Sequence, residues 1–426
     1  MQEAAKKAGM ANLDVALEPE AASLYCSINK DIDQNFFKKG EYYIVCDLGG
    51  GTGDIVAHLV GTNNHLNEIY PSCGGNYGSN EIDKLIFEEI IFSLFKCKDF
   101  NGFYSKYKRK NKDNIEEGGI LYNDWSELER EIRDFKEGGT NKKVENNEKY
   151  PINCSLFKDI FPDDIDISDI VYEYNINIFD KDLHLNVIKS KRKWIIEFPY
   201  KILYNYIKAQ ANSICKIIKE ILSKENIKTV IFVGGYCFCE ILLKLIKEGL
   251  PQISHYLQPT KPCLSIMEGA VIFGIEPSSI NIRKAKYTMG ADLRVPWNQK
   301  LHTQICKKFS TEDNSYYCNE YFEKFIEINE NIELDKKIVR KYLMVGKRFC
   351  NMKFYITKKK DPIHIFEEGL EEIGECCLDA GKDYENKDDR EIEVTITFGG
   401  TYFDVRAIHI KSGNFITKKL NYNKFN

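Results

Sequence analysis

The chain has 426 residues, of which 43% are hydrophobic and 12% aromatic, enough apolar material for two or three packed domains. Its formal net charge of −4 gives no reason to expect a nucleic acid or an anionic membrane as partner. The 14 cysteines form no CxxC pair, which argues against a zinc site, and no apolar run reaches the length of a membrane span. We therefore expect a cytoplasmic globular protein with buried, reduced thiols.

The chemistry-bearing motifs lie close together at the beginning of the chain, before Ser79. "LDVALEPEAASLYCSI" predicts a strand, a turn at Pro19 and the start of a helix. "YYIVCDLGGGTGDIVAHLV" (42–60) follows, with two strand-like runs joined by three glycines, and it predicts a hairpin. A loop is expected at "CGGNYG" (73–78), and Ser79 then begins a long amphipathic helix.

The remaining chain alternates between polar and structured segments. Residues 99–151 are polar and charged, which predicts a surface loop or insertion. A long helix is predicted over 200–226, then a buried strand, a Gly-Gly turn and another helix over 227–250, and a third helix over 265–275. Alternating runs after about residue 290 predict antiparallel β structure. We place a domain boundary near 289, separating residues 1–289 from 290–426.

Three phosphate-binding interpretations compete for "DLGGGTGD". A P-loop requires a lysine that is not there, and a Rossmann turn must open a helix, whereas "DIVAHLV" continues as a strand. A glycine hairpin tip instead exposes backbone N–H groups that can hold phosphate oxygens. Thr52 adds a hydroxyl group, and Asp47 and Asp54 can hold Mg²⁺ through its waters. The alternative is an ordinary tight hairpin with two solvated aspartates.

Five motifs in order, EPEAA, DLGGGTGD, CGGNYG, VGGY and EGAVIFG, make the pattern more specific. Together they resemble the actin-like nucleotide-binding domain of the heat shock protein 70 family of chaperones. Within that family the chain is most similar to the atypical 12A/12B branch, from about residue 2 to the end. The resemblance implies an α/β, actin-like ATPase (ribonuclease H-like) lobe, with a partial N-terminal lobe before it and a smaller β-rich domain after it.

The resemblance also implies catalytic roles. Glu18 would lie at the crossover between the two lobes, facing the catalytic water and magnesium. Asp47 would position the magnesium waters, with Asp54 as a second carboxylate, and Thr52 would reach toward the γ-phosphate. The reaction would be in-line attack of water on the γ-phosphate of ATP, catalysed by positioning and charge neutralisation.

The implied contacts to ATP or ADP come from the glycine motifs and from three further side chains. They are Gly49, Gly50, Gly51, Thr52, Gly74, Gly75, Lys136, Gly234, Gly235 and Tyr236. The helix that clamps adenine in this family is matched best by residues 125–137, where Lys136 is the one residue of the family pattern that is retained.

The loss of the other family residues in that helix is one departure from the family pattern. A second departure is that the family's first phosphate-binding hairpin, of the DxGTT type, is absent from this sequence. One wall of the nucleotide cleft would then be missing, as in a truncated paralogue or a fragment of a longer protein. Two hypotheses remain. The first is an ATP-binding protein whose ATP hydrolysis is coupled to client or regulatory proteins, and the second is a non-enzymatic interaction module, or a gene fragment, that has lost ATP turnover.

Overall fold

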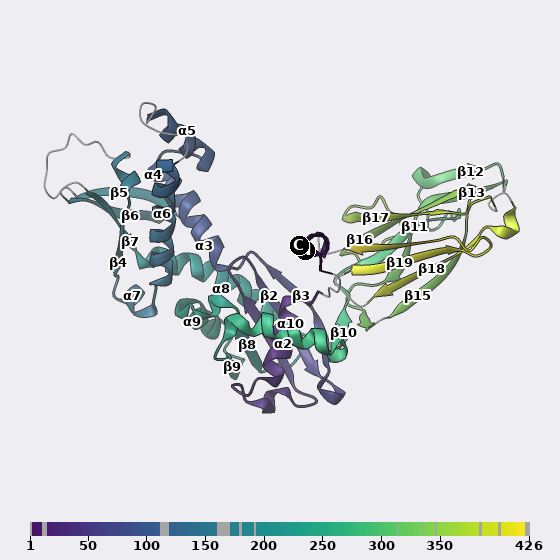
Figure 1. Ribbon diagram of the computed structural model, residues 1–426, viewed down its shortest axis with the longest axis horizontal. Coiled ribbons are helices and arrows are strands. Elements are labelled where there is room, and N and C mark those ends of the chain that lie inside the picture. Colours follow the sequence, from purple (N-terminus) through teal and green to yellow (C-terminus); the bar gives the residue numbers. More distant parts are fainter. Residues whose placement is uncertain are drawn as a thin grey trace.

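The computed structural model describes most of the chain, and its parts are seen in Figure 1. The described residues are 2–10, 15–110, 119–159, 171–178, 181–190, 193–312, 314–334, 336–345, 347–382, 386–398 and 402–421. Within these ranges the strands form four sheets, of seven, five, four and four strands, combined with helices. The predicted mixed α/β class is therefore confirmed. None of the described helices is both long and apolar enough to cross a membrane.

The seven-stranded sheet occupies the centre of the molecule (Figure 1). In spatial order its strands are β14 (Asn331–Glu333), β10 (Ile280–Lys284), β3 (Leu66–Gly75), β2 (Gly53–Val60), β1 (Tyr42–Leu48), β8 (Thr229–Val233) and β9 (His255–Leu257). Strands β1, β2 and β3 form an antiparallel meander, whereas β8 lies parallel to β1. This order places the ends of β1 and β8 side by side.

Both faces of the central sheet are covered by helices. On one face, α2 (Glu18–Ile28) and α10 (Ser265–Ile275) share a core with Tyr43 and Val45 of β1. On the other face, α8 (Tyr200–Leu222) and α9 (Glu240–Gly249) share a core with Ile44 and Cys46. Because neighbouring side chains of a strand point to opposite faces, a strand covered on both faces is apolar throughout. This explains the continuous apolar runs of β1 and β8.

Residues 79–199 build a separate layer at one end of the molecule (Figure 1). Its elements are α3 (Ser79–Leu85), a π-helical turn (Ile86–Ile91), α4 (Phe92–Leu94), α5 (Phe100–Lys110), α6 (Gly119–Glu137), α7 (Asn141–Glu145), β4 (Lys149–Asn153), β5 (Val171–Ile178), β6 (Lys181–Ser190) and β7 (Lys193–Pro199). Of the surface loop or insertion predicted over 99–151, the loop is wrong because helices occupy the described part, the insertion stays a prediction, and 111–118 lie outside the described residues. Leu128, Ile132 and Phe135 of α6 are fully buried at helical spacing, and only the outer face of the helix is polar.

The chain after about residue 288 forms two further sheets, at the other end of the molecule (Figure 1). One contains β12 (Lys307–Ser310), β13 (Ser315–Ile326), β11 (Thr288–Pro296), β16 (Phe349–Thr357) and β17 (Leu370–Asp379), and the other β15 (Lys337–Leu343), β18 (Glu391–Phe398), β19 (Tyr402–His409) and β20 (Phe415–Asn421). All pairings in both sheets are antiparallel, as predicted. Their inner faces share one apolar core. Strand β14 returns to the central sheet, and the boundary at 289 stays a prediction.

Two short helices begin the chain. Helix α1 spans Gln2–Lys7, and α2 begins at Glu18. The turn predicted at Pro19 is wrong, because Pro19 lies in the first turn of α2, where a helix leaves its N–H groups unpaired and proline is tolerated.

Candidate functional site

The glycine hairpin is the centre of the candidate site. Strands β1 and β2 pair so that Asp47 lies opposite Asp54, and the predicted hairpin is confirmed. The Gly49 N–H group donates to the Thr52 carbonyl at 3.0 Å, which closes the turn. Among the residues that the structure describes, no acceptor pairs with the N–H groups of Gly50 and Gly51. Two donors suited to an anion are thus presented at the tip.

Helix α3 is fixed directly onto this turn. The N–H groups of Ser79 and Asn80 donate to the carbonyls of Gly49 and Gly50, at 3.2 and 2.8 Å. Gly78 precedes the helix, and a Cβ atom there would collide with the Gly50 carbonyl. Sequence reasoning did not single out Gly78. The close approach of two backbone segments explains why this position carries no side chain.

Two other predicted glycines lie in close contact with Asp54 and Asp47. Gly74 belongs to β3, paired opposite Asp54, so the loop predicted over 73–78 is wrong at its beginning. A Cβ atom on Gly74 would meet the Gly53 carbonyl and the Asp54 carboxylate, which explains why a glycine stands within this strand. Gly234 follows β8 with φ of +86°, and a Cβ atom there would meet the Leu48 carbonyl and Asp47. These two glycines leave space around the carboxylates.

The carboxyl group of Asp47 is the most unusual group of the site. Asp47 is only 3% exposed, and its Oδ1 atom has no hydrogen-bond partner among the described residues. Burial raises the pKa of Asp47 to about 7, and the charges of Glu18 and Asp54 act in the same direction. A buried carboxylate is normally hydrogen-bonded or paired with a cation. The unpaired Asp47 oxygen, together with the negative charges of Glu18 and Asp54 that act on it, fits a hydrated divalent cation.

Thr52 and Asp54 form a pair at the rim of this cluster. The Thr52 Oγ1 hydroxyl donates to Asp54 Oδ2 at 2.9 Å. Thr52 is exposed, Asp54 is half-buried, and Glu18 is exposed at the first turn of α2. The structure therefore brings Glu18, Asp47 and Asp54 together, with Thr52 at the edge, while their catalytic and metal-binding roles remain predictions.

Tyr236 and Lys136 lie in the hydrogen-bond network behind the glycine turn. The Tyr236 hydroxyl donates to Gln210 Oε1 at 2.9 Å, and Gln210 Nε2 donates to the Gly78 carbonyl at 3.2 Å. Lys136 of α6 pairs with Asp83 Oδ2 at 2.6 Å and donates to the Ser79 carbonyl at 3.3 Å. Both residues thus hold the start of α3, whereas their predicted contacts with nucleotide are untested.

The three remaining glycine positions differ in how closely they are packed. A Cβ atom on Gly75 would lie 3.1 Å from the Tyr77 ring, and one on Gly51 would meet nothing within 4 Å. Gly235 begins a short 3₁₀ turn (Gly235–Phe238), with the Cys263 sulfur 3.8 Å from where its Cβ atom would be. At Gly51 and Gly235, therefore, a methyl group would fit sterically.

A buried ion pair involving α2 was missed by sequence reasoning. Glu20 of α2 is 2% exposed and accepts two hydrogen bonds from Arg283 of β10, Nε to Oε1 at 2.7 Å and Nη2 to Oε2 at 2.8 Å. On the same helix, Ser23 bonds both the Tyr43 hydroxyl at 2.7 Å and Nδ1 of His58 at 2.9 Å. The available signal was a charged residue within the buried stretch of a helix, but its partner is 263 residues away.

Comparisons with known proteins agree with the resemblance found in the sequence. No protein-family profile matches the chain. It is 22% identical over 480 residues to heat shock 70 kDa protein 12A of Homo sapiens, across 98% of this chain and 67% of that protein. It is equally similar, at 22% over 492 residues, to heat shock 70 kDa protein 12B of Homo sapiens, across 99% of this chain and 68% of that protein.

The structural comparison includes a pCBH ParM non-polymerisable quadruple mutant, with a TM-score of 0.32 and 13% identity, covering 60% of this chain and 52% of that one. By its own sheets and helices, the chain is a mixed α/β protein with a glycine hairpin and a buried aspartate beside it. Its resemblance to the atypical heat shock 70 kDa protein 12A/12B branch is confirmed over nearly its whole length.

Proposed function

We propose that the β1–β2 turn and its three carboxylates bind the phosphates of ATP or ADP together with Mg²⁺. The observation that carries this proposal is the buried, unpartnered Oδ1 atom of Asp47, which adjoins Glu18 and Asp54 at a turn with two N–H donors unpaired among the described residues. The resemblance to the heat shock protein 70 family points to the same ligand. A divalent cation would neutralise phosphate charge at this position.

Each part of the turn has a defined task in this proposal. The N–H groups of Gly50 and Gly51 donate to phosphate oxygens, and the Thr52 hydroxyl group lies beside them. Asp47 and Asp54 accept hydrogen bonds from the waters of the cation. Gly234 and Gly74 keep side chains away from those carboxylates. Glu18, exposed at the start of α2, would orient the attacking water in the ATP hydrolysis that we propose for this site.

Calorimetric titration of the purified chain with Mg-ADP and Mg-ATP tests this proposal. We expect binding in the micromolar range, weakened at least about tenfold by Asp47→Asn, which removes the charge but keeps the shape. Asp31→Asn is the matched control, because Asp31 is an exposed carboxylate after the end of α2, and it should leave the affinity unchanged. No heat at millimolar nucleotide, or equal affinity for the Asp47 variant, would contradict the proposal.

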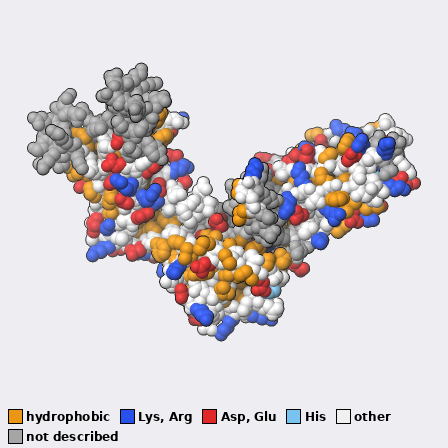
Figure 2. Space-filling model, viewed as in Figure 1, with side chains coloured by type: hydrophobic (Ala, Val, Ile, Leu, Met, Phe, Trp, Pro, Cys, Tyr) orange, Lys and Arg blue, Asp and Glu red, His pale blue; other side chains and the backbone are white. Residues whose placement is uncertain are grey.

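A second candidate function, protein interaction, is favoured by the exposed side of α10. Met267, Val271 and Ile275 recur every four residues on one side of the helix and are 60, 61 and 80% exposed. Figure 2 shows hydrophobic side chains gathered in the centre of the molecule, where Figure 1 places α10. An exposed apolar helix face of this kind fits an apolar surface of a client or regulatory protein.

This second function can be separated from the first. Val271→Lys should reduce the binding of an apolar fluorescent dye to the chain and leave the affinity for Mg-ADP unchanged, because Val271 is exposed on α10 and is not part of the glycine turn or its carboxylates. If the dye binds equally to both proteins, the α10 face is not the exposed apolar surface.

A further inference from the structure

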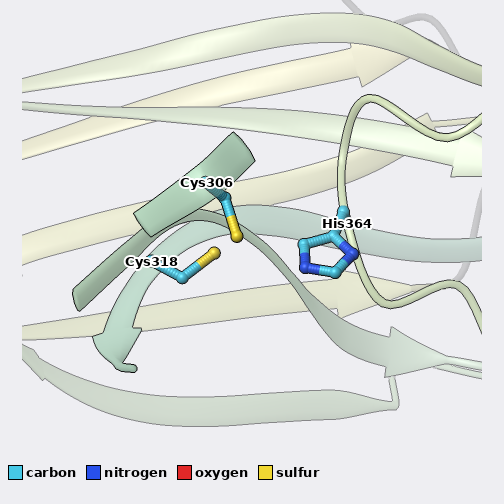
Figure 3. Close-up of side chains that lie close together, drawn as sticks. All are labelled: Cys306, Cys318 and His364. Atoms are coloured by element: carbon cyan, nitrogen blue, oxygen red, sulfur yellow. The ribbon is translucent and has the colours of Figure 1, made fainter. Parts of the chain in front are cut away.

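Two cysteines and one histidine converge in the C-terminal sheets, far from the glycine turn in sequence. Cys306, Cys318 and His364 each offer one ligand atom, and these atoms lie within 4.8 Å of one another. Cys306 and Cys318 are fully buried, and His364 is 4% exposed. Figure 3 shows the two sulfur atoms and one ring nitrogen of His364 turned toward a common point. No sequence spacing revealed the cluster, because 45 residues lie between Cys318 and His364.

Backbone pairing brings the three residues together. Cys306 ends a short 3₁₀ turn (Gln304–Cys306) immediately before β12, whose residue Lys307 pairs with Cys318 of β13. The segment around His364 lies against β13 further along the strand, where His364 forms an isolated bridge with Tyr321. Flanking hydrogen bonds, from the Phe322 N–H to the Ile363 carbonyl at 2.9 Å and from the Ile365 N–H to the Glu320 carbonyl at 3.0 Å, hold that segment in place.

One nitrogen of the His364 imidazole is buried without a hydrogen-bond partner among the described residues. Glu367 Oε1 accepts the N–H groups of Ile363 and His364, at 2.7 and 3.0 Å, which fixes the local backbone. The Nε2 atom is buried and has no hydrogen-bond partner within the described parts of the chain. Buried polar atoms are almost always paired, so an unpaired nitrogen beside two sulfur atoms points to a ligand that is bound there.

We propose that Cys306, Cys318 and His364 bind a zinc ion. Two thiolates and one imidazole are ligands that Zn²⁺ prefers, with bonds of about 2.3 Å to sulfur and about 2.0–2.1 Å to nitrogen. In a tetrahedron of these bonds, neighbouring ligand atoms lie roughly 3.4–3.8 Å apart. Side-chain rotations that close the observed spacing by up to about 1 Å would complete the three protein bonds.

The fourth position is assigned to a water molecule. His302 lies near, with its ring centroid 5.8 Å from that of His364, but its Nδ1 accepts the Asn298 N–H at 3.1 Å. The neutral ring then carries its proton on Nε2 and cannot use that atom as a ligand. Three protein ligands and one solvent molecule are a known zinc arrangement.

Zinc binding at this site is coupled to the loss of protons from the two thiols. A free cysteine thiol, with an ordinary pKa of about 8.5, keeps its proton at neutral pH. Zinc must displace that proton, and its affinity should therefore increase with pH.

Cobalt binding to the full chain tests the site. The protein is stripped with a chelator and kept in a phosphine reductant, and Co²⁺ is then titrated and displaced with Zn²⁺. We expect about one Co²⁺ per chain and an absorption band from thiolate-to-cobalt charge transfer, which disappears when zinc is added. Absence of this band in the unmodified chain overturns the proposal, and so does a Cys306–Cys318 disulfide that persists in reductant and prevents uptake.

Variants locate the metal. Cys318→Ser should abolish the band, and His364→Ala should weaken cobalt binding at least about tenfold. Cys376→Ser is the matched control, because Cys376 is a 2% exposed cysteine of the same sheet outside the cluster, and its band should be unchanged. A band that survives in Cys318→Ser, or that is lost in Cys376→Ser, would place the metal elsewhere. Far-ultraviolet circular dichroism confirms that each variant is folded.

Discussion

The central sheet and the C-terminal sheets bury their residues in different ways. Strand β8 is buried at every residue, because helices cover both faces of the central sheet, whereas β18 alternates between half-buried and buried positions because only one of its faces meets the other sheet. A polar group on a sheet that is covered on both faces cannot form hydrogen bonds with water. An unpaired one, such as Asp47 Oδ1, therefore marks the place of a ligand.

The same reasoning distinguishes the two candidate ligand sites. At the central sheet the unpaired atom is a carboxylate oxygen among carboxylates, which suits a hard cation and its waters. In the C-terminal sheets it is the His364 nitrogen beside two sulfur atoms, which suits a softer metal. The comparison predicts that substitutions of buried groups in the central region change the free energy of unfolding more than similar substitutions on the C-terminal surface do.

The largest effect is expected at the contact between α2 and α10. A Cβ atom on Gly269 would overlap the Ala21 carbonyl, so Gly269→Val must push two backbones apart. We expect a loss of at least ~4 kcal/mol in the free energy of unfolding, measured by urea denaturation. Gly274→Ala in the same helix is the control. Its added methyl group meets nothing within 4 Å, and it should stabilise the chain by about 0.5–1 kcal/mol. Equal effects of the two substitutions would refute the close packing.

The next effect concerns the ion pair of Glu20 and Arg283. Glu20→Gln leaves a partly buried guanidinium without its bidentate carboxylate, and we expect it to lower the free energy of unfolding by about 3–4 kcal/mol. The double variant with Arg283→Met should recover part of that loss, since it removes the charge that Glu20 neutralises. Losses that simply add in the double variant would show that the two side chains do not interact.

The third prediction is a gain of stability. Asp47 has a pKa of about 7 in the folded chain, above its ordinary value of 3.8, so its contribution to stability is lost as pH rises through 7. Asp47→Asn should then stabilise the ligand-free chain by ~2–3 kcal/mol at pH 8, with little change at pH 4. Thermal unfolding at the two pH values measures this. A variant that is less stable than the parent at pH 8 would show that the carboxylate is well satisfied.

The smallest effect is expected for an ion pair of similar geometry on the C-terminal sheet. Arg348 bonds Asp379 at 2.8 and 2.7 Å, but the two side chains are 54 and 39% exposed. Water screens such a pair, so Asp379→Asn should change the unfolding midpoint in urea by little more than the experimental error at pH 7. The pKa of Asp379 is lowered to about 2 by Arg348, so any contribution that it makes is present above pH 4 and is lost as pH falls toward 2. A loss as large as that of Glu20→Gln would contradict the comparison.

Local signals predicted much of the central fold. Three glycines between strand-like runs predicted the β1–β2 hairpin, and helical spacing predicted α8, α9 and α10. Composition predicted a surface loop or insertion over 99–151 because the outer face of α6 is polar, and only the family resemblance matched residues 125–137 to a helix. The strand that carries Gly74 was missed because glycine is uncommon within strands, and here the close Gly53 carbonyl and Asp54 carboxylate explain it.

The candidate site was predictable in part. Asp47, Thr52, Asp54 and the glycines were identified by their order along the chain, and the structure brings Asp47, Thr52 and Asp54 to one turn. The network behind the turn was not predicted, because the sequence shows Gln210 only as one polar residue of a helix. Its hydrogen bonds to Tyr236 and Gly78 depend on the tertiary structure. The partnership of Lys136 with Asp83 also depends on how α6 packs on α3.

The sequence by itself determined the mixed α/β class, the glycine hairpin and the resemblance to the heat shock protein 70 family, because turns and periodic apolar runs are encoded by neighbouring residues. Only the tertiary structure decided which distant groups meet. It buried Asp47 beside Glu18, paired Glu20 with Arg283, and brought His364 to Cys306 and Cys318. Such contacts depend on how whole elements pack, and packing is a property of the assembled fold.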